Sequence, residues 1–300
     1  MPATLVTGAS GYVGGLLVRR LRSTGRTVGG VARDPSRLDL GPDVAVHRAD
    51  MLEPDSLRRI DVGYTTAYYL VHSMGRGGDG GYERRDEQAA SHFARYAKDA
   101  GIEQVVYLGG LGDRPGSPHL RSRLRVGEIL RDEGPPLTWL RAGMIVGAGS
   151  DSYRTLRYLV ERLPVMLAPE WLKTPTQAVA IGDVLRYLVG SIEIAGACGR
   201  QIQIGSTEIL TYGSMLDAMA DALGRRRRPR IPVPLLSPWL SSHWIGLVTP
   251  VDAAVARPLV EGLSTDTTVT DRSGMELFDF APIPFAQALK QAIAEDAGVS

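Results

Sequence analysis

The sequence predicts an α/β protein built on a doubly wound parallel sheet, and two observations lead to this prediction. A glycine-rich turn at residues 7–15 joins an apolar, β-branched segment to an amphipathic one near the N-terminus. Short apolar segments then alternate with segments of helical periodicity over about 140 residues. Because this alternation is typical of parallel strands joined by crossover helices, we expect helices on both faces of the sheet.

Composition excludes several classes of protein. The 300 residues carry a net charge of +1, so no overall field favours nucleic acid or an anionic membrane. Cys198 is the one cysteine, which excludes an internal disulfide and a cysteine metal cluster. No His/Glu cluster has metal-ligand spacing, so no metal is predicted. A single cysteine is typical of a protein from a reducing compartment. The sequence begins with a predicted core strand where a signal peptide would stand, so we expect a cytoplasmic protein.

The glycine-rich turn predicts a dinucleotide site between a strand at residues 3–6 and a helix at residues 16–22. Gly8 permits the tight turn, Gly11 lets the backbone approach a pyrophosphate, and Gly14 lets the helix pack closely. The helix N-terminus offers free N–H groups and the positive end of its dipole to the phosphates. The residues of this turn expected at the cofactor are Gly8, Ser10, Gly11, Tyr12, Val13 and Gly14.

The end of the second predicted strand, residues 26–32, is expected to meet the adenosine ribose. An acidic side chain there binds the ribose hydroxyls and selects NAD, whereas an arginine accommodates the 2′-phosphate and selects NADP. Arg33 and Asp34 stand side by side at this position. Because Arg33 comes first, NADP is the predicted cofactor and NAD the alternative. Asp34 is either a ribose ligand or, with Pro35 after it, the cap of a short turn.

The next two predicted strands, residues 44–47 and 66–71, also end in candidate ligands. Asp50 lies either beside the adenine or at a solvated strand end. Ligands of such sheets bind beyond the carboxyl ends of the strands, so His72 and Ser73 are placed to face the cofactor or the substrate. The residues of these two strand ends expected at the cofactor are Asp50, Met51, Leu70, Val71 and His72.

The remaining pattern divides the chain into two parts. We expect a nucleotide-binding domain at residues 1–150, completed by residues 176–205, and a smaller substrate lobe at residues 206–300. The predicted helices are residues 82–100, 122–131, 152–163, 181–189 and 212–223. The predicted strands are residues 104–108, 137–140 and, as the last strand, 200–204. A polar loop is expected at residues 171–177. Gly109 follows the fifth strand and is expected at the cofactor.

Two segments of the second part indicate which partners the protein could bind. The basic run Arg225–Arg228 has no interleaved aromatic residues, so it is interpreted as a solvated turn and no nucleic-acid partner is expected. Residues 231–260 are apolar but broken by five prolines, so they do not span a bilayer. Two interpretations of this segment stay open, a wall over the pocket of a hydrophobic substrate and a contact with a membrane surface.

Several motifs resemble the atypical short-chain dehydrogenase/reductases, and among them the NmrA-like NAD(P)H-binding branch. These motifs are Thr7-Gly8-Ala9-Ser10-Gly11-Tyr12-Val13-Gly14, Arg33-Asp34-Pro35, Tyr69-Leu70-Val71-His72-Ser73-Met74, Tyr107-Leu108-Gly109-Gly110-Leu111 and Leu140-Arg141-Ala142-Gly143. The resemblance implies a Rossmann domain with a smaller carboxyl-terminal substrate lobe. It also implies NADP(H) held by Gly8, Gly11, Gly14 and Arg33.

One departure from that family affects the expected chemistry. Active members use a Tyr-x-x-x-Lys pair as proton donor and helper, and no tyrosine here has lysine four residues on. At this place stands His119-x-x-x-Arg123, which suits a general acid beside an arginine on one helical face. Pro118 leaves open the alternative that His119 is exposed at a helix start. The catalytic candidates are His119, Arg123, His72 and Ser73.

The sequence thus predicts an NADPH-dependent reductase of a hydrophobic carbonyl, quinone or activated alkene. The missing Tyr-x-x-x-Lys pair leaves two alternatives, a non-catalytic protein that senses NADP(H) and a redox-neutral epimerase or dehydratase that uses bound cofactor. No Gly-x-Ser-x-Gly motif is present, which argues against a serine hydrolase. A homodimer remains open, because long helices on this fold often pair.

Overall fold

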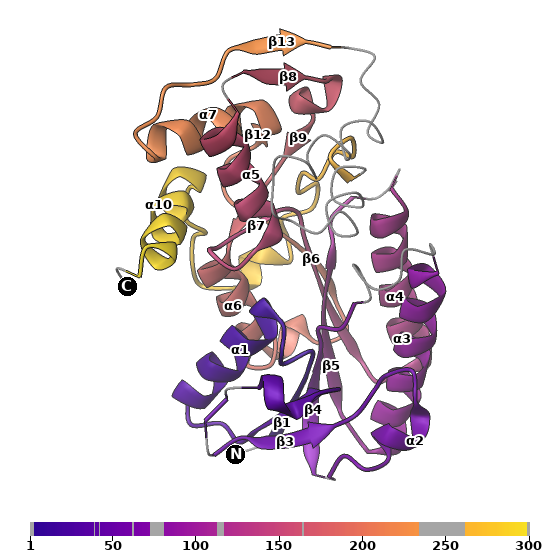
Figure 1. Cartoon of the computed structure of the whole chain (residues 1–300). Helices are drawn as coiled ribbons and strands as arrows, with labels where there is room; N and C mark the ends of the chain where they lie inside the picture. The colour runs from indigo at the N-terminus through magenta and orange to yellow at the C-terminus, as the bar shows by residue number, and fades with distance from the viewer. Residues whose placement is uncertain are drawn as a thin grey trace.

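The computed structural model describes residues 3–298 apart from residues 39, 42, 62, 73–80, 113–116, 164 and 234–261. At its centre lies a seven-stranded sheet (Figure 1). Its strands are β1 (Ala3–Thr7), β2 (Val28–Ala32), β3 (Ala45–Arg48), β4 (Tyr64–Tyr69), β5 (Gln104–Gly110), β6 (Leu137–Ala142) and β11 (Gln201–Ile204).

These strands follow the order β11-β6-β5-β4-β1-β2-β3, and each neighbouring pair is parallel. The order reverses between β1 and β4, which is where doubly wound sheets bind their ligands. The predicted fold class, an α/β protein with a doubly wound parallel sheet, is confirmed.

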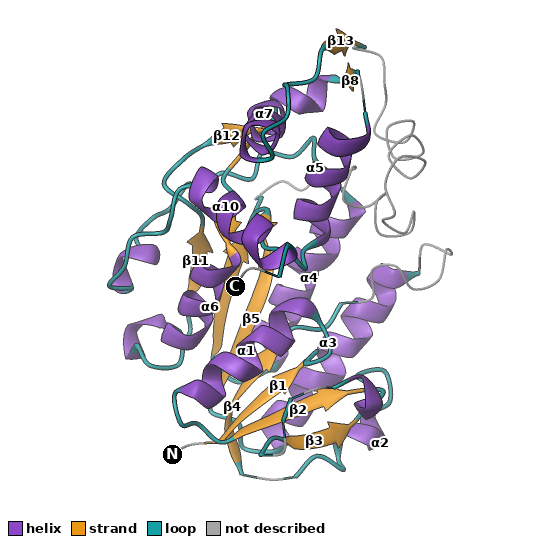
Figure 2. Cartoon of the chain, turned by 60° about the vertical axis from the view of Figure 1, so that its left-hand side comes forward, coloured by secondary structure: helices purple, strands orange, loops and turns teal. Residues whose placement is uncertain are grey.

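Helices cover both faces of the sheet (Figures 1 and 2). One face is packed by α1 (Tyr12–Ser23) and α6 (Ile181–Gly190). The other face is packed by α2 (Pro54–Leu57), α3 (Tyr82–Asp99) and α4 (Pro118–Glu133). Two hydrophobic cores result, one on each side of the sheet, and together they hold the carboxyl ends of the strands in fixed positions.

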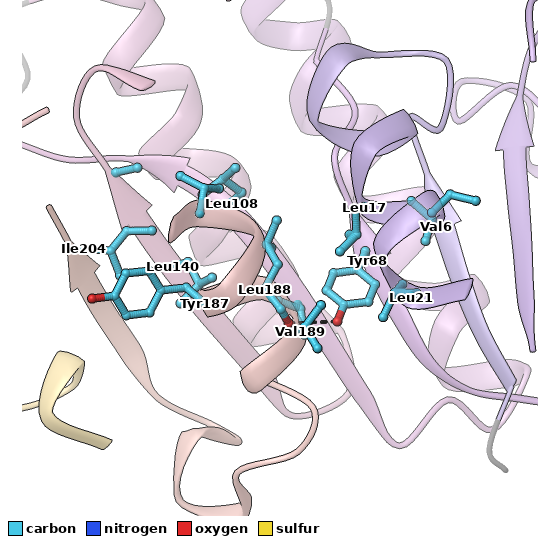
Figure 3. Close-up of a cluster of buried hydrophobic side chains, with 14 of the residues drawn as sticks. Val6, Leu17, Leu21, Tyr68, Leu108, Leu140, Tyr187, Leu188, Val189 and Ile204 are labelled. Carbon is cyan, nitrogen blue, oxygen red and sulfur yellow. Dashed lines mark hydrogen bonds between the residues drawn. The ribbon is translucent and has the colours of Figure 1, made fainter. Parts of the chain in front are cut away.

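The core on the α1 side contains a buried hydrogen bond that ties α6 to the sheet (Figure 3). Tyr68 of β4 is fully buried among aliphatic side chains that include Leu21. Its hydroxyl donates a hydrogen bond to the Leu188 carbonyl of α6 over 2.8 Å. Because an unpartnered hydroxyl is costly in such surroundings, this bond fixes α6 in position against the centre of the sheet.

A second group of elements forms a lobe above the carboxyl ends of the strands (Figure 1). Its helices are α5 (Asp151–Arg162), α7 (Tyr212–Ala222) and α10 (Phe285–Asp296). Its paired short strands are β7 (Ile145–Val146) with β10 (Val179–Ala180), β9 (Pro175–Thr176) with β12 (Leu210–Thr211), and β8 (Met166–Ala168) with β13 (Arg230–Pro232). Four 3₁₀ turns, Pro35–Arg37, Glu170–Lys173, Ala195–Ala197 and Met275–Leu277, complete the described elements.

Two elements differ in their bounds from the sequence prediction for identifiable reasons. The strand predicted at 66–71 ends at Tyr69, because the Leu70 N–H leaves the sheet ladder and donates to the Thr7 Oγ1 over 3.3 Å. The helix predicted at 122–131 begins at Pro118, because the Ser117 hydroxyl accepts from the Leu120 N–H and caps an earlier turn.

The predicted polar loop at 171–177 is partly core. Trp171 and Leu172 are buried in the lobe, where the Trp171 ring stands against Tyr212 with 6.2 Å between ring centroids. The strand Gln201–Ile204 is not the last one, since β12 and β13 follow it. The sequence analysis did not predict α10.

In the part of the chain that the structure describes, no helix has the length and apolar character needed to cross a membrane.

Candidate cofactor and active site

The turn between β1 and α1 has no room for a side chain at Gly8 or Gly14. Gly8 has φ +70°, and a Cβ added there would lie 2.5 Å from the Leu70 carbonyl oxygen of the neighbouring strand end. A Cβ on Gly14 would lie 2.3 Å from the Gly8 carbonyl oxygen, so α1 packs directly on the turn. Gly11 has φ −83°, which any residue adopts, so its lack of a side chain serves space and not conformation.

The N-terminus of α1 is open toward the switch point of the sheet. Gly11 is its N-cap residue, no side chain of the described residues caps it, and its first turn contains no acid. Its first N–H groups therefore lack the usual partners and point toward the turn, which is the arrangement that binds a diphosphate. The glycine cradle and the uncapped helix together fit a dinucleotide.

Three other residues of the turn are placed in different ways. Ser10 is exposed, whereas Val13 is half-buried against the core. The Tyr12 ring packs on the loop of Gly147 and Gly149, where an added Cβ on Gly149 would lie 2.2 Å from the ring. Burial and the nearby Glu295 carboxylate raise the pKa of Tyr12 to about 12, so its hydroxyl stays protonated. The side chain of Tyr12 thus faces the lobe, and only its backbone remains directed at the cofactor turn.

After β2, the adjacent residues Arg33 and Asp34 have different roles in the structure. The Asp34 carboxylate accepts from the backbone N–H of Ser36 over 3.1 Å and from its hydroxyl over 2.6 Å. It therefore caps the turn Pro35–Arg37, the second of the two interpretations considered for it. The Arg33 guanidinium is half exposed, with its Nη1 3.9 Å from Asp50 Oδ2. Arg33 and Asp50 thus lie together where the ribose is expected.

The residues after β3 divide into one at the surface and one in the core. Asp50 is half-buried, and its carboxylate accepts from the Leu52 N–H over 3.0 Å. Met51 has its side chain in the core below, and its carbonyl oxygen lies 2.9 Å from Nδ1 of His92. Any contact of Met51 with an adenine therefore has to come from its backbone.

The end of β4 lies against the glycine turn. Leu70 and Val71 are half-buried, and His72 is exposed at the carboxyl end of the sheet. The Thr7 hydroxyl donates to the Tyr68 carbonyl over 2.9 Å, which joins β1 to β4 at this level. Ser73 lies outside the described residues.

The His-x-x-x-Arg pair lies on the first two turns of α4. Pro118 occupies the first helical position, so His119 is already inside the helix, half-buried, and shares a face with Arg123. Arg123 Nη1 donates to the Leu108 carbonyl over 3.4 Å, so this side chain spans from α4 to the end of β5. The Tyr107 hydroxyl donates to the Arg123 carbonyl over 3.0 Å and holds the same helical turn.

His119 has unusual electrostatics. Burial, then the positive charge of Arg123, then His72, lower the pKa of His119 well below its ordinary value of 6.5. Because His72 follows β4 and His119 starts α4, the fold brings together two candidates that are 47 positions apart in the sequence. At neutral pH His119 is an uncharged imidazole, and Arg123 supplies the positive charge beside it.

Two glycines of β5 make room for neighbouring side chains. A Cβ on Gly109 would lie 2.5 Å from Trp139 Nε1, so Gly109 accommodates that indole ring. A Cβ on Gly110 would lie 2.9 Å from a Leu120 methyl and 3.7 Å from Arg123 Cβ. Gly110 is therefore the β5 position next to the His-x-x-x-Arg pair.

Sequence reasoning did not single out Arg141 as a functional candidate. This side chain is buried near the end of β6, 2% exposed. Its Nε donates to the Gly110 carbonyl over 3.1 Å and its Nη2 to the Gly112 carbonyl over 2.7 Å. Arg141 thus holds the chain where it leaves β5 toward α4. A charged residue inside an otherwise apolar strand is the signal that sequence reasoning had available.

Sequence reasoning also missed a segment that returns over the sheet after residue 261. An added Cβ on Gly112 would lie 3.2 Å from a Thr265 methyl, which places this segment beside the β5 loop. The Val269 N–H donates to Gln177 Oε1 over 2.8 Å, and the Thr270 N–H donates to Gln203 Oε1 over 2.7 Å. Residues 265–270 therefore form a wall at the carboxyl end of β5, β6 and β11.

Comparisons with known proteins agree with this geometry. Residues 8–147 match the model of a family described as NAD(P)H-binding. Ceramide reductase of Caulobacter vibrioides is 26% identical over 245 residues, which are 71% of this chain and 77% of that protein. The match agrees with the resemblance seen in the sequence motifs.

Two solved structures share the fold over nearly the whole chain. Triphenylmethane reductase of Citrobacter sp., crystallised with NADP(H), has a TM-score of 0.77 at 18% identity, over 96% of this chain and 99% of that one. UDP-glucose 4-epimerase of Thermotoga maritima, crystallised with UDP-glucose, has a TM-score of 0.73 at 14% identity, over 99% and 98% of the two chains. At these identities the likeness establishes the fold and no particular reaction.

Proposed function

We propose, from the match of residues 8–147 to the model of a family described as NAD(P)H-binding, that the protein is an NADPH-dependent reductase of a hydrophobic carbonyl compound. The observation that carries this proposal is the meeting of His119, Arg123 and His72 at the carboxyl end of the same sheet whose glycine turn is shaped for a dinucleotide. When bound, NADPH supplies a hydride to the carbonyl carbon.

The residues of the chain have separate tasks in this proposal. Gly8, Gly11 and Gly14 with the first turn of α1 hold the diphosphate, and Arg33 receives the 2′-phosphate, with Asp34 occupied by its cap. Arg33 is therefore the reason to favour NADP over NAD.

Arg123 and His119 act on the substrate oxygen. As the carbonyl carbon gains a hydride, its oxygen gains negative charge, which the Arg123 guanidinium stabilises in a partly buried setting. The neutral His119 imidazole donates an N–H hydrogen bond to that oxygen and delivers its proton to the alkoxide, and the imidazolate left beside Arg123 takes a proton back from water. The sequence predicted His119 as a general acid without its charge state, and here it works as an uncharged imidazole.

The proposed substrate is a ketone on a long apolar molecule. Two observations support this class. The name of the Caulobacter relative specifies reduction of a ceramide, and residues 231–260 of this chain are apolar and proline-rich. A quinone or an activated alkene remains the runner-up, since the same oxygen-binding pair would serve a quinone.

The test is NADPH oxidation by the purified chain with a panel of long-chain ketones, quinones and enones. His119→Gln and Arg123→Gln should each lower kcat by about a hundredfold or more, with the dissociation constant of NADPH unchanged. His92→Gln is the matched control, because His92 lies on α3 against the Met51 carbonyl and should retain turnover.

Other outcomes would contradict the proposal. Full turnover in both variants would remove the assigned roles of His119 and Arg123. Tight NADPH binding without turnover of any substrate would favour a sensor of NADP(H). Product formation with no net change of cofactor redox state would favour an epimerase or a dehydratase.

A further inference from the structure

The tip of the lobe, formed by β8, β13 and the turn Arg225–Arg228 before β13, combines exposed aliphatic side chains with excess positive charge. Of the described residues, four large hydrophobic side chains are markedly exposed, and two of them lie here: Val165 at 39% and Ile231 at 53%. Figures 1 and 2 both place β8 and β13 at the end of the molecule remote from β3.

The strand register explains why Ile231 faces outward. β13 pairs with β8 in parallel, with Arg230 opposite Met166. Met166 is buried in the lobe, and Arg230 turns inward to the Gly213 carbonyl and the Asp217 carboxylate, at 2.6 and 2.7 Å. Because side chains alternate along a strand, the next residue, Ile231, points to the opposite face of the pair.

The arginine run is only partly neutralised. Arg227 pairs with Asp221 over 2.7 Å, and Arg228 donates to the Val160 carbonyl over 2.9 Å. Arg225 and Arg226 are exposed, and no acidic side chain of the described residues pairs with them. Residues 212–233 hold five arginines and two aspartates, a net charge of +3, while the whole chain carries +1. The positive charge is therefore concentrated at this tip.

We propose that this tip, presenting Arg225, Arg226, Val165 and Ile231, docks on a bilayer containing anionic phospholipid. Arginines placed against lipid phosphates and aliphatic side chains placed among the acyl chains are the two contributions that hold a peripheral protein on a membrane. A protein partner with an acidic groove, a nucleic acid and a second copy of the chain are the other occupants, and the experiment below distinguishes them from a bilayer.

Docking of this kind goes beyond the proposed reaction. It would bring the protein to its proposed substrate, since a long-chain ketone resides in a bilayer. The proposed reaction and the proposed docking can be tested independently of each other. Turnover of a short-chain, water-soluble ketone without vesicles reports on the reaction alone, whereas vesicle binding by the chain without any substrate reports on docking alone.

The experiment is co-sedimentation of the full chain with phosphatidylcholine vesicles, with and without phosphatidylglycerol. The wild-type chain should bind the anionic vesicles and lose binding as salt is raised, because exposed charges are screened. Arg225→Gln with Arg226→Gln should weaken binding about tenfold or more, and Ile231→Ser should weaken it further. All variants should keep turnover of the soluble ketone.

Matched controls separate the tip from the rest of the surface. Arg19→Gln with Arg20→Gln changes the net charge equally on the exposed face of α1, and Ile209→Ser removes an isoleucine that is 61% exposed elsewhere. Both should bind vesicles as the wild type does. Docking is overturned if the wild type fails to bind anionic vesicles, if the tip variants bind as tightly as the controls, or if the tip instead mediates dimerisation or binding to a nucleic acid.

Discussion

At the scale of single residues, the most informative side chain is His119. Burial, Arg123 and His72 lower the pKa of His119 well below 6.5, so protonation of this group opposes the native arrangement. An unfolded chain binds that proton near pH 6.5, whereas the folded chain binds it only at lower pH. The contribution of His119 to stability is therefore complete above pH 6.5 and is lost as the pH falls below that value.

The same shift predicts the pH dependence of the reaction. Because the neutral imidazole is the proposed donor, kcat/KM for ketone reduction should stay level around pH 7 to 8 and fall on the acid side, as the pH passes through the lowered pKa of His119. An imidazolium donor would give the reverse, a rate that falls as the pH rises. Steady-state profiles of the wild type and His92→Gln should share the acid limb, and a rate that rises toward acid pH would refute the neutral donor.

At the scale of elements, the β1–α1 turn depends on contacts between backbone atoms. Gly14 lies one helical turn into α1, and the Gly8 carbonyl occupies the space that a side chain of Gly14 would need. Gly15, the next residue of the same helix, is far less crowded, since its added Cβ would meet the Ala9 carbonyl at 3.5 Å. Two adjacent glycines of one helix thus have different reasons to be glycine.

Alanine substitutions at these two positions should therefore act in opposite directions. Gly14→Ala has to displace α1 from the turn and should weaken NADPH binding about tenfold or more, together with a lower Tm. Gly15→Ala should leave binding unchanged and raise stability by about 0.5–1 kcal/mol, because alanine is the better helix former. Calorimetric titration with NADPH and thermal melts measure both, and equal effects of the two substitutions would contradict the assigned packing role of Gly14.

At the scale of the whole molecule, two glutamines join the lobe to the sheet. Gln177 and Gln203 accept hydrogen bonds from the backbone of residues 269 and 270, and Gln203 also accepts from the Asp271 N–H over 3.2 Å. These bonds hold the wall of residues 265–270 at the carboxyl end of the strands. The carboxyl edge of the sheet and the returning segment are consequently parts of one packed unit.

Gln203→Ala should cost about 1–3 kcal/mol of unfolding free energy, because it removes the acceptor of the Thr270 and Asp271 N–H groups and each hydrogen bond contributes about 0.5–1.5 kcal/mol. Gln201→Ala removes an exposed glutamine from the same strand and should change stability by less than about 0.5 kcal/mol. Urea denaturation of the two variants provides the comparison. Equal stabilities would show that Gln203 does not hold the returning segment.

The sequence by itself determined the alternation of strands and helices and the glycine turn, because periodicity and backbone conformation relate residues that are near in the chain. It left two local questions open, whether Asp34 binds a ribose or caps a turn and whether the helix of Arg123 includes His119, and the structure answers both. Only the tertiary structure decided that His72 lies near His119, that Arg141 holds the exit of β5, and that Gln203 binds residue 270. Those contacts depend on how packed layers bring distant strand ends together, and no local pattern encodes that distance.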